Sequence, residues 1–224
     1  MIEIQGLWKR YHHHIAYDWV LEDINLTIPP KVSVGLIGQN GAGKSTLLRL
    51  IAEMDSPSRG RIIRNCSVSW PIGLSGGLHA MMTGRQNVKF VARVHGAENI
   101  KEIIEFVQDF AEIGKAFDEP VSTYSSGMAS RIRFGLSLAF DFDVFLSDEA
   151  TAVGDRLFRQ KAEQAFKDRI GKSSLIIVSH QEGILKSLCQ AGIWIKEKKA
   201  YWYEDINDAI NEYHQYSDQK DKLR

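Results

Sequence analysis

The sequence predicts an α/β fold, and three observations support that prediction. Over Val32 to Met54, a short apolar run is followed by a glycine-rich loop and then by a helical pattern. Two later apolar runs, Asp143 to Glu149 and Ser174 to His180, have the length and composition of buried strands. Strands that alternate with helices in this way are typical of an α/β core.

The composition limits the classes of function. The 224 residues suffice for one large domain or for one domain with an inserted lobe. Lys and Arg together number 28, as do Asp and Glu, so no basic excess indicates a nucleic-acid partner. Cys66 and Cys189 lack metal-like spacing. With no signal peptide and no run of about 18 apolar residues, the chain is expected in the cytosol, or on a membrane only through a partner.

The N-terminal part is expected to be rich in strands. IEIQGLW (residues 2–8) opens as a short strand, and Trp19 to Ile28 alternates like a strand with one face in solvent. KVSVGLIG (31–38) predicts a buried strand, and LLRLIAEM (47–54) predicts the helix after the loop. The glycines and proline of SWPIGLSGGLHAMMTG (69–84) disfavour regular structure, so a loop is expected there.

Helices are expected to dominate the middle of the chain. The pattern is helical from Gln86 to Phe117 and again through SRIRFGLSLAF (130–140). Residues from about 75 to 140 are therefore expected to form a helical lobe, and the core would comprise about 1–74 and 141–224. A hairpin in IWIKEKKAYWY (193–203) and a final helix in INDAINEYHQY (206–216) complete the expected elements.

One motif points directly to phosphate chemistry. Gly38 to Ser45, GQNGAGKS, matches G-x-x-x-x-G-K-[ST] between a predicted strand and a predicted helix. Glycines let backbone N–H groups curve around phosphates, and the helix N-terminus adds positive potential. Lys44 can reach the β- and γ-phosphates, and the Ser45 hydroxyl can ligate Mg²⁺. The candidate binding residues are Gly38, Gln39, Asn40, Gly41, Ala42, Gly43, Lys44, Ser45 and Thr46.

Two carboxylates end the predicted strand from Asp143 to Glu149. Alone, such a pair is usually only the end of a strand. Combined with a phosphate loop, it predicts that Asp148 holds Mg²⁺ through the water shell of the ion and that Glu149 polarises the attacking water.

A Ser/Gly loop, YSSGMASR from Tyr124 to Arg131, lies between these two motifs. In this order the motifs resemble those of the ATP-binding cassette (ABC) ATPases, and the resemblance covers nearly the whole chain. It implies a P-loop NTPase (RecA-like) core with an antiparallel β subdomain and an inserted α-helical subdomain. It also implies ATP as the nucleotide and Mg²⁺ as the metal ion.

The resemblance extends to the signature loop, which reads LSGGQ in the family. This chain has Tyr124, Ser125, Ser126, Gly127 and Met128 at those positions. In the family the loop contacts the ATP that the opposite subunit of a head-to-tail dimer binds. The Ser125 hydroxyl and the Gly127 N–H match the contacting positions.

Two further family positions follow the carboxylate pair. The D-loop, usually SALD, corresponds to Ala152, Val153, Gly154 and Asp155. The switch histidine, which contacts the γ-phosphate and positions the attacking water, corresponds to His180 at the end of IIVSH.

An aromatic side chain upstream of the phosphate loop is implied to stack on adenine. Tyr11 stands where the family usually places it. Because YHHHIAYDW makes this loop longer than usual, Tyr17 and Trp19 are alternatives.

The expected loop at 69–84 departs from the family pattern. Counting back from MTGRQN, the glutamine that usually contacts Mg²⁺ and water would fall at Gly73 or Leu74, where neither residue is glutamine. Gln86 is no substitute, because it occupies the family's glutamate position beside Asn87. The loop is nevertheless expected to couple the nucleotide to a membrane subunit.

WPIGLSGG, TGRQNVKFVAR, YSSGM and DEATAVGD together most resemble the ATPases of capsular polysaccharide exporters in Gram-negative bacteria. This resemblance implies ATP-driven export of a lipid-linked polysaccharide from the cytoplasmic face of the inner membrane. The implied partners are a second copy of the chain, an integral membrane permease and periplasmic or outer-membrane export proteins. O-antigen or teichoic acid export is the alternative within this class.

Two other classes are disfavoured. Soluble ABC proteins of DNA repair or translation typically have a coiled-coil insertion or tandem cassettes, and neither is present in the sequence. The ordered signature loop, D-loop and switch histidine argue against a P-loop kinase or GTPase outside the ABC family.

Overall fold

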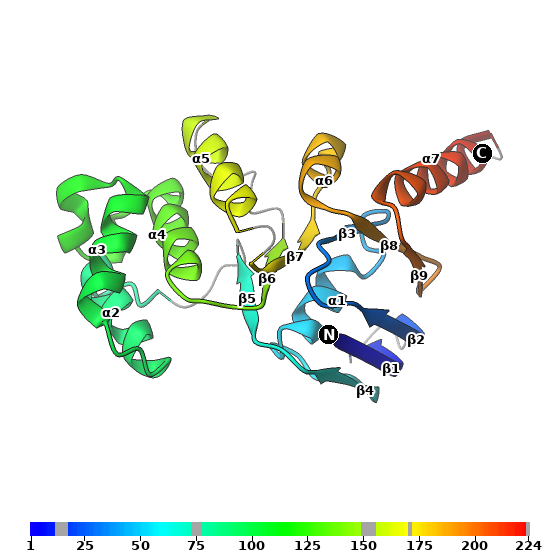
Figure 1. The fold of residues 1–224 in the computed structure, drawn as a ribbon, viewed down its shortest axis with the longest axis horizontal. Coiled ribbons are helices and arrows are strands. Elements are labelled where there is room, and N and C mark those ends of the chain that lie inside the picture. Colours follow the sequence, from blue (N-terminus) through cyan, green and yellow to red (C-terminus); the bar gives the residue numbers. More distant parts are fainter. Residues whose placement is uncertain (12–17, 73–77, 149–155, 170–171, 223–224) are drawn as a thin grey trace. The chain divides into compact units, whose positions relative to one another are not determined.

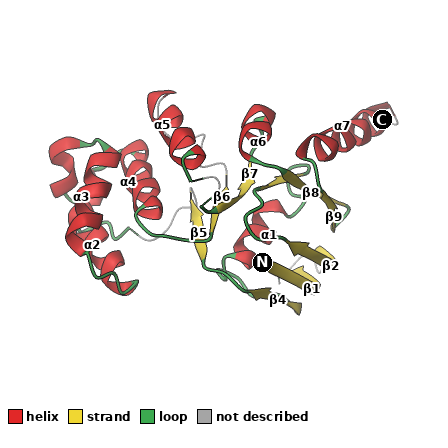
Figure 2. Cartoon of the chain, viewed as in Figure 1, coloured by secondary structure: helices red, strands yellow, loops and turns green. Residues whose placement is uncertain are grey.

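The computed structural model describes residues 1–11, 18–72, 78–148, 156–169 and 172–222. The chain divides into two compact units (Figures 1 and 2). The first contains the described residues of Met1–Pro71, Phe142–Glu149 and Phe166–Arg224, and the second those of Ile72–Asp141 and Ala150–Ala165. Beyond residue 141, the described residues of Phe142–Glu149 thus group with the first unit and those of Ala150–Ala165 with the helical unit. The sequence-based division, with a core of about 1–74 and 141–224, stays a prediction.

A six-stranded sheet organises the first unit, with strand order β5-β6-β7-β3-β8-β9. Strands β6, β7, β3 and β8 run parallel, and β9 pairs antiparallel with β8 as the predicted hairpin. The strands are β3 (Val34–Ile37), β5 (Val68–Ile72), β6 (Val144–Asp148), β7 (Ser174–Val178), β8 (Ala191–Lys196) and β9 (Lys199–Tyr203). The helices of this unit include α1 (Lys44–Ile51), α6 (Glu182–Leu188) and α7 (Ile206–Lys222).

A smaller antiparallel sheet of order β2-β1-β4 belongs to the same unit. Its strands are β1 (Ile2–Arg10), β2 (Trp19–Ile28) and β4 (Arg59–Arg64). Ile2 and Ile4 are buried two residues apart, as the period of two requires, and a register shift between Ile4 and Leu7 moves the buried positions to Leu7 and Lys9. Together the two sheets and the helices confirm the predicted fold class.

Helices build the second unit, where Figure 2 shows α2, α3 and α4 grouped together. They are α2 (Gly84–Val94), α3 (Ile100–Ala111) and α4 (Ser126–Leu138), with 3₁₀ turns at Gly114–Asp118 and Val121–Thr123. The described residues of α5 (Arg156–Lys167) contribute Phe158, whose ring packs edge-on to Phe110 and Phe134 at 5.7 and 5.9 Å. None of the helices in the described ranges combines the length and hydropathy of a membrane-spanning segment.

The prediction of a loop throughout 69–84 is wrong at its start. Ser69 to Ile72 belong to β5, and the Ser69 hydroxyl accepts a hydrogen bond from Leu146 N at 2.9 Å. Pro71 is tolerated because β5 is an edge strand, where a missing N–H donor leaves no ladder bond unmade. Gly73 and Leu74 lie outside the described residues.

Candidate functional site

The phosphate loop joins β3 to α1 through glycines that no other residue could replace without strain. Gly38, Gly41 and Gly43 have φ angles of +152°, +77° and +107°. A Cβ on Gly38 would lie 2.6 Å from Ile195 O, and one on Gly43 would lie 2.9 Å from the Leu21 side chain. The backbone therefore follows a path that side chains would block, as a loop that encloses phosphates requires.

Lys44, the first residue of α1, is held within this loop. Its side chain is buried, and Nζ donates to the carbonyl oxygens of Gly38 and Gln39 at 2.8 and 2.9 Å. The helix N-cap is Gly43, which has no side chain to accept from the first-turn N–H groups. The loop thus combines a cation, a helix N-terminus and glycines at positive φ, which fits the phosphates of a nucleotide.

His180 lies beside the phosphate loop although it comes 134 positions after Thr46 in the chain. A cavity of about 280 Å³ is bordered by this histidine and by residues of the loop and of α1. Its lining residues are Val20, Asn40, Gly41, Gly43, Lys44, Ser45, Thr46, Val178 and His180. Parallel pairing of β3 with β7 brings them together, because the carboxyl ends of both strands meet at one sheet edge.

Asp148 ends β6 at the same edge of the sheet. It lies in register with Val178 of β7, a residue that lines the cavity next to His180. Glu149 and Asp155 lie outside the described residues. The structure therefore places one of the two predicted carboxylates, and the catalytic role of Glu149 stays a prediction.

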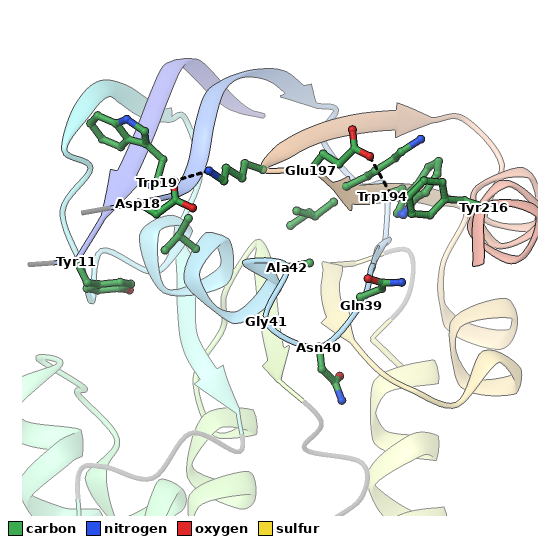
Figure 3. A pocket seen from close by; sticks show the side chains of 14 residues that line it. Tyr11, Asp18, Trp19, Gln39, Asn40, Gly41, Ala42, Trp194, Glu197 and Tyr216 are labelled. Atoms are coloured by element: carbon green, nitrogen blue, oxygen red, sulfur yellow. Dashed lines mark hydrogen bonds and ion pairs between the residues drawn. The ribbon is translucent and has the colours of Figure 1, made fainter. Parts of the chain in front are cut away.

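Two of the three candidate stacking residues are described, and their surroundings differ. The Trp19 ring packs edge-on to Trp8 at 5.1 Å, and the guanidiniums of Arg10 and Arg59 lie 4.8 and 5.3 Å from its centroid. Tyr11 and Trp19 both line a cavity of about 650 Å³ that Gln39–Ala42 also border (Figure 3). Tyr17 lies outside the described residues.

The Tyr11 hydroxyl donates to Asp55 Oδ2 at 2.8 Å. Burial, followed by this hydrogen bond, raises the pKa of Tyr11. Burial also favours the protonated form of Asp55, but hydrogen bonds from Lys9 and Tyr11 outweigh it and lower the pKa of that carboxyl.

The wall of the larger cavity opposite Tyr11 contains residues that the sequence did not indicate. Glu197 and Lys198 form the β8–β9 turn with φ angles of +48° and +67°, where Asn-Gly is the favoured pair. Lys198 Nζ lies 2.5 Å from Asp18 Oδ1 and 3.3 Å from Glu22 Oε1, and Tyr216 donates to Glu197 at 2.9 Å (Figure 3). The signal available in the sequence was the pair Glu197 and Lys198, two charged residues in a hairpin turn where glycine is usual.

The predicted signature loop lies in the second unit, at the start of α4. Ser125 is the N-cap, and its Oγ accepts from Met128 N at 3.2 Å. Ser125 and Ser126 are exposed, and a Cβ on Gly127 would have only Ser125 Oγ within 4 Å, at 3.8 Å. The loop is therefore an open helix N-terminus, a geometry suited to an anion.

The segment after the missing glutamine is organised by two amides. Thr83 and Gln86 form a capping box at the start of α2, because each side chain accepts from the backbone N–H of the other. The buried Asn87 accepts from His79 N at 2.6 Å and donates to carbonyl oxygens of His79, Met82 and Thr83. The T-x-x-Q spacing was the signal for this box, and sequence reasoning did not use it.

Comparison with known sequences gives matches along most of the chain. A profile of the ABC transporter family matches residues 21–152. The chain is 50% identical over 220 residues to the polysialic acid transport ATP-binding protein KpsT of Escherichia coli, covering 97% of this chain and 98% of that protein. It is 37% identical to the capsule polysaccharide export ATP-binding protein CtrD of Neisseria meningitidis serogroup B, covering 95% and 98%. The teichoic acids export ATP-binding protein TagH of Bacillus anthracis is also 37% identical, but the match covers 89% of this chain and 37% of that protein.

Among solved structures, the ATP-binding cassette MJ0796, a dimer in a post-hydrolysis state bound to ADP and Pi, superposes with a TM-score of 0.79. The match covers 92% of this chain and 99% of that chain at 20% identity. At this identity the likeness shows a shared fold.

Proposed function

The chain belongs to the ABC transporter family, and we propose that it is the ATP-hydrolysing subunit of an exporter of capsular polysaccharide. The observation that carries this proposal is the 50% identity to a polysialic acid transport ATP-binding protein over 97% of the chain. The phosphate loop, with Lys44 hydrogen-bonded inside it and His180 beside it, supplies residues suited to binding and hydrolysing a nucleoside triphosphate.

The nucleotide would bind with its phosphates in the loop from Gly38 to Thr46. Lys44 is already held at the loop and would turn from the carbonyls of Gly38 and Gln39 to the β- and γ-phosphates. His180 would contact the γ-phosphate, and Glu149 would polarise the attacking water. Tyr11 is the preferred stacking residue, because Trp19 already packs against Trp8 and two guanidiniums.

A hydroxyl and a carboxylate, the hard oxygen ligands that Mg²⁺ prefers, are available at this edge of the sheet in Ser45 and Asp148. Mg²⁺ bound there with ATP would neutralise charge on the β- and γ-phosphates.

Two copies of the chain would enclose two ATP molecules. The exposed N-terminus of α4, with Ser125 and Gly127, would meet the γ-phosphate held by the other copy. A ligand shifts a conformational equilibrium only through its different affinity for the two states. The γ-phosphate supplies that difference, because the signature loop of the opposite copy reaches it only in the closed pair.

Force would pass to an integral membrane permease through the segment from Ser69 to Gly84. Asn87 and the Thr83–Gln86 capping box give the end of this segment a defined shape. The assembly would lie at the cytoplasmic face of the inner membrane, and periplasmic or outer-membrane export proteins would carry the polymer onward. A teichoic acid or O-antigen exporter is the second candidate, and the partial coverage of TagH makes it the weaker one.

The proposal is tested in encapsulated Gram-negative cells whose own export ATPase is replaced by this chain. We expect surface polysaccharide with the wild-type chain, and Lys44→Ala should leave the polymer inside the cell. Lys172→Ala, an exposed lysine far along the chain, is the matched control. Export that proceeds normally with Lys44→Ala would contradict an ATP-driven role for this chain.

A further inference from the structure

Lys9 is a buried lysine next to the candidate stacking residue. Its side chain is 8% exposed, and Nζ donates to Asp55 Oδ1 at 2.5 Å and to Ser56 O at 2.8 Å. Lysine is almost never buried unless it is paired, and Asp55 supplies the pair. The second carboxylate oxygen of Asp55 accepts from the Tyr11 hydroxyl, so one carboxylate links the ammonium to the phenol.

These contacts hold the Tyr11 ring at two points. The hydroxyl is tethered to Asp55, and Lys9 Nζ lies 4.7 Å from the ring centroid, over one face. The ring also borders the larger cavity beside the phosphate loop. A base bound in this cavity would therefore reach the ring.

The tether also ties the ring to the helix that carries the phosphate loop. Asp55 follows α1, whose first residue is Lys44, and the Tyr11 hydroxyl has a hydrogen-bonding contact with the Thr46 side chain in the first turn. A helix of eight residues is about 12 Å long and rigid. A ring anchored to this helix stands at a defined distance from the phosphate loop, and ATP has only a limited reach between its base and its phosphates.

We propose that Lys9 and Asp55 are positioning residues that hold Tyr11 for stacking on the adenine of ATP. This inference rests on the proposed nucleotide site and names two residues that act through Tyr11. Pre-orientation of the ring would raise nucleotide affinity, because less side-chain freedom is lost on binding. A pair that only stabilised the packing of β1 on α1 would have no such selective effect.

The test compares two probes, ADP and inorganic tripolyphosphate, by calorimetric titration of the full chain. ADP engages both the ring and the phosphate loop, whereas tripolyphosphate engages only the loop. Tyr11→Leu should weaken ADP about tenfold, the size expected for a lost base–aromatic stack. Asp55→Asn should weaken ADP about fivefold and leave tripolyphosphate unchanged, and Asp109→Asn, which removes an exposed carboxylate of α3, should change neither.

The double variant Tyr11→Leu/Asp55→Asn separates positioning from general stability. If Asp55 acts through the ring, adding Asp55→Asn to Tyr11→Leu produces no further loss of ADP affinity. The ATPase of Asp55→Asn should show a raised KM with kcat unchanged, and Lys9→Arg should restore part of the affinity that Lys9→Met loses. If Asp55→Asn does not fold, Tyr11→Phe removes the hydroxyl tether alone and should still weaken ADP severalfold.

The outcomes are distinguishable. Wild-type chain that binds no ADP contradicts the proposed nucleotide function, and Tyr11→Leu with unchanged ADP affinity contradicts the stacking assignment. Positioning is overturned if Asp55→Asn and Tyr11→Phe leave ADP affinity intact while Tyr11→Leu lowers it. It is also overturned if Asp55→Asn weakens ADP and tripolyphosphate by the same factor.

Discussion

Alanine at Gly38 should destabilise the protein much more than alanine at Gly41, although both glycines belong to the phosphate loop. Both have positive φ, at +152° and +77°, so each substitution introduces backbone strain. The surroundings differ, because a Cβ on Gly38 would lie 2.6 Å from Ile195 O, whereas one on Gly41 has nothing within 4 Å. Gly41→Ala is therefore an internal control that carries the strain without the clash.

The expected magnitudes follow from that geometry. A residue other than glycine at positive φ costs about 1–2 kcal/mol, which is the whole effect expected for Gly41→Ala. At Gly38 a contact of ordinary length requires the carbonyl of Ile195 to retreat by about 0.7 Å. Ile195 is buried in β8, which pairs with both β3 and β9, so this shift adds about 1–3 kcal/mol. For a chain of this size, 1 kcal/mol lowers the unfolding midpoint by about 2–4 °C.

The assay is thermal unfolding followed by circular dichroism, together with ADP titration of each folded variant. We expect Gly38→Ala to lower the midpoint by about 10 °C and Gly41→Ala by about 4 °C. Equal shifts for the two variants would refute the reasoning, because they would mean that the Ile195 carbonyl does not limit the loop. Unchanged ADP affinity in a folded Gly38→Ala would refute the claim that this path of the backbone serves phosphate binding.

Three further predictions concern other parts of the molecule. Ser125→Ala removes the N-cap of α4 and should cost about 1 kcal/mol, whereas Ser125→Thr keeps the capping oxygen and should cost less, which chemical denaturation of the two variants compares. The folded-state pKa of Asp55 is lowered, so its ionisation stabilises the fold above its ordinary pKa of about 4 and that contribution is lost as the pH falls through the lowered folded value. The difference in unfolding midpoint between wild type and Asp55→Asn should therefore shrink between pH 7 and about pH 3, and a constant difference would argue against the Lys9–Asp55–Tyr11 contacts. Burial raises the pKa of Cys189 to about 12, so an aromatic disulfide reagent should label the half-buried Cys66 well before Cys189 in the folded chain, and equal rates would contradict that burial.

Local patterns in the sequence were sufficient for most of the elements. The apolar runs at Val34–Ile37, Val144–Asp148 and Ser174–Val178 form parallel strands, because a buried strand needs only a few β-branched or apolar residues in succession. The glycine pattern of Gly38 to Ser45 was sufficient to predict the phosphate loop, because the backbone of this loop needs positive φ angles that glycine adopts without strain.

Sequence reasoning missed two features: a strand at the edge of the six-stranded sheet, and backbone hydrogen bonds made by side-chain amides. The sequence predicted a loop from Ser69 onward, but Ser69 to Ile72 belong to the strand Val68–Ile72. Pro71 disfavours a strand unless the strand lies at a sheet edge, and strand order is not visible in the sequence. The role of Asn87 was also hidden, because it depends on which backbone groups the fold leaves near its side chain. The capping role of Gln86 was different, since the T-x-x-Q spacing was available in the sequence and was not used.

By itself the sequence determined the fold class, the phosphate loop and the family, because these depend on residue types at short, fixed spacings. Only the tertiary structure brought His180 to that loop, joined Lys9 and Asp55 to Tyr11, and separated the surroundings of Tyr11 from those of Trp19. Strand order and helix packing set those distances between residues far apart in the chain. No local pattern of residues contains that information.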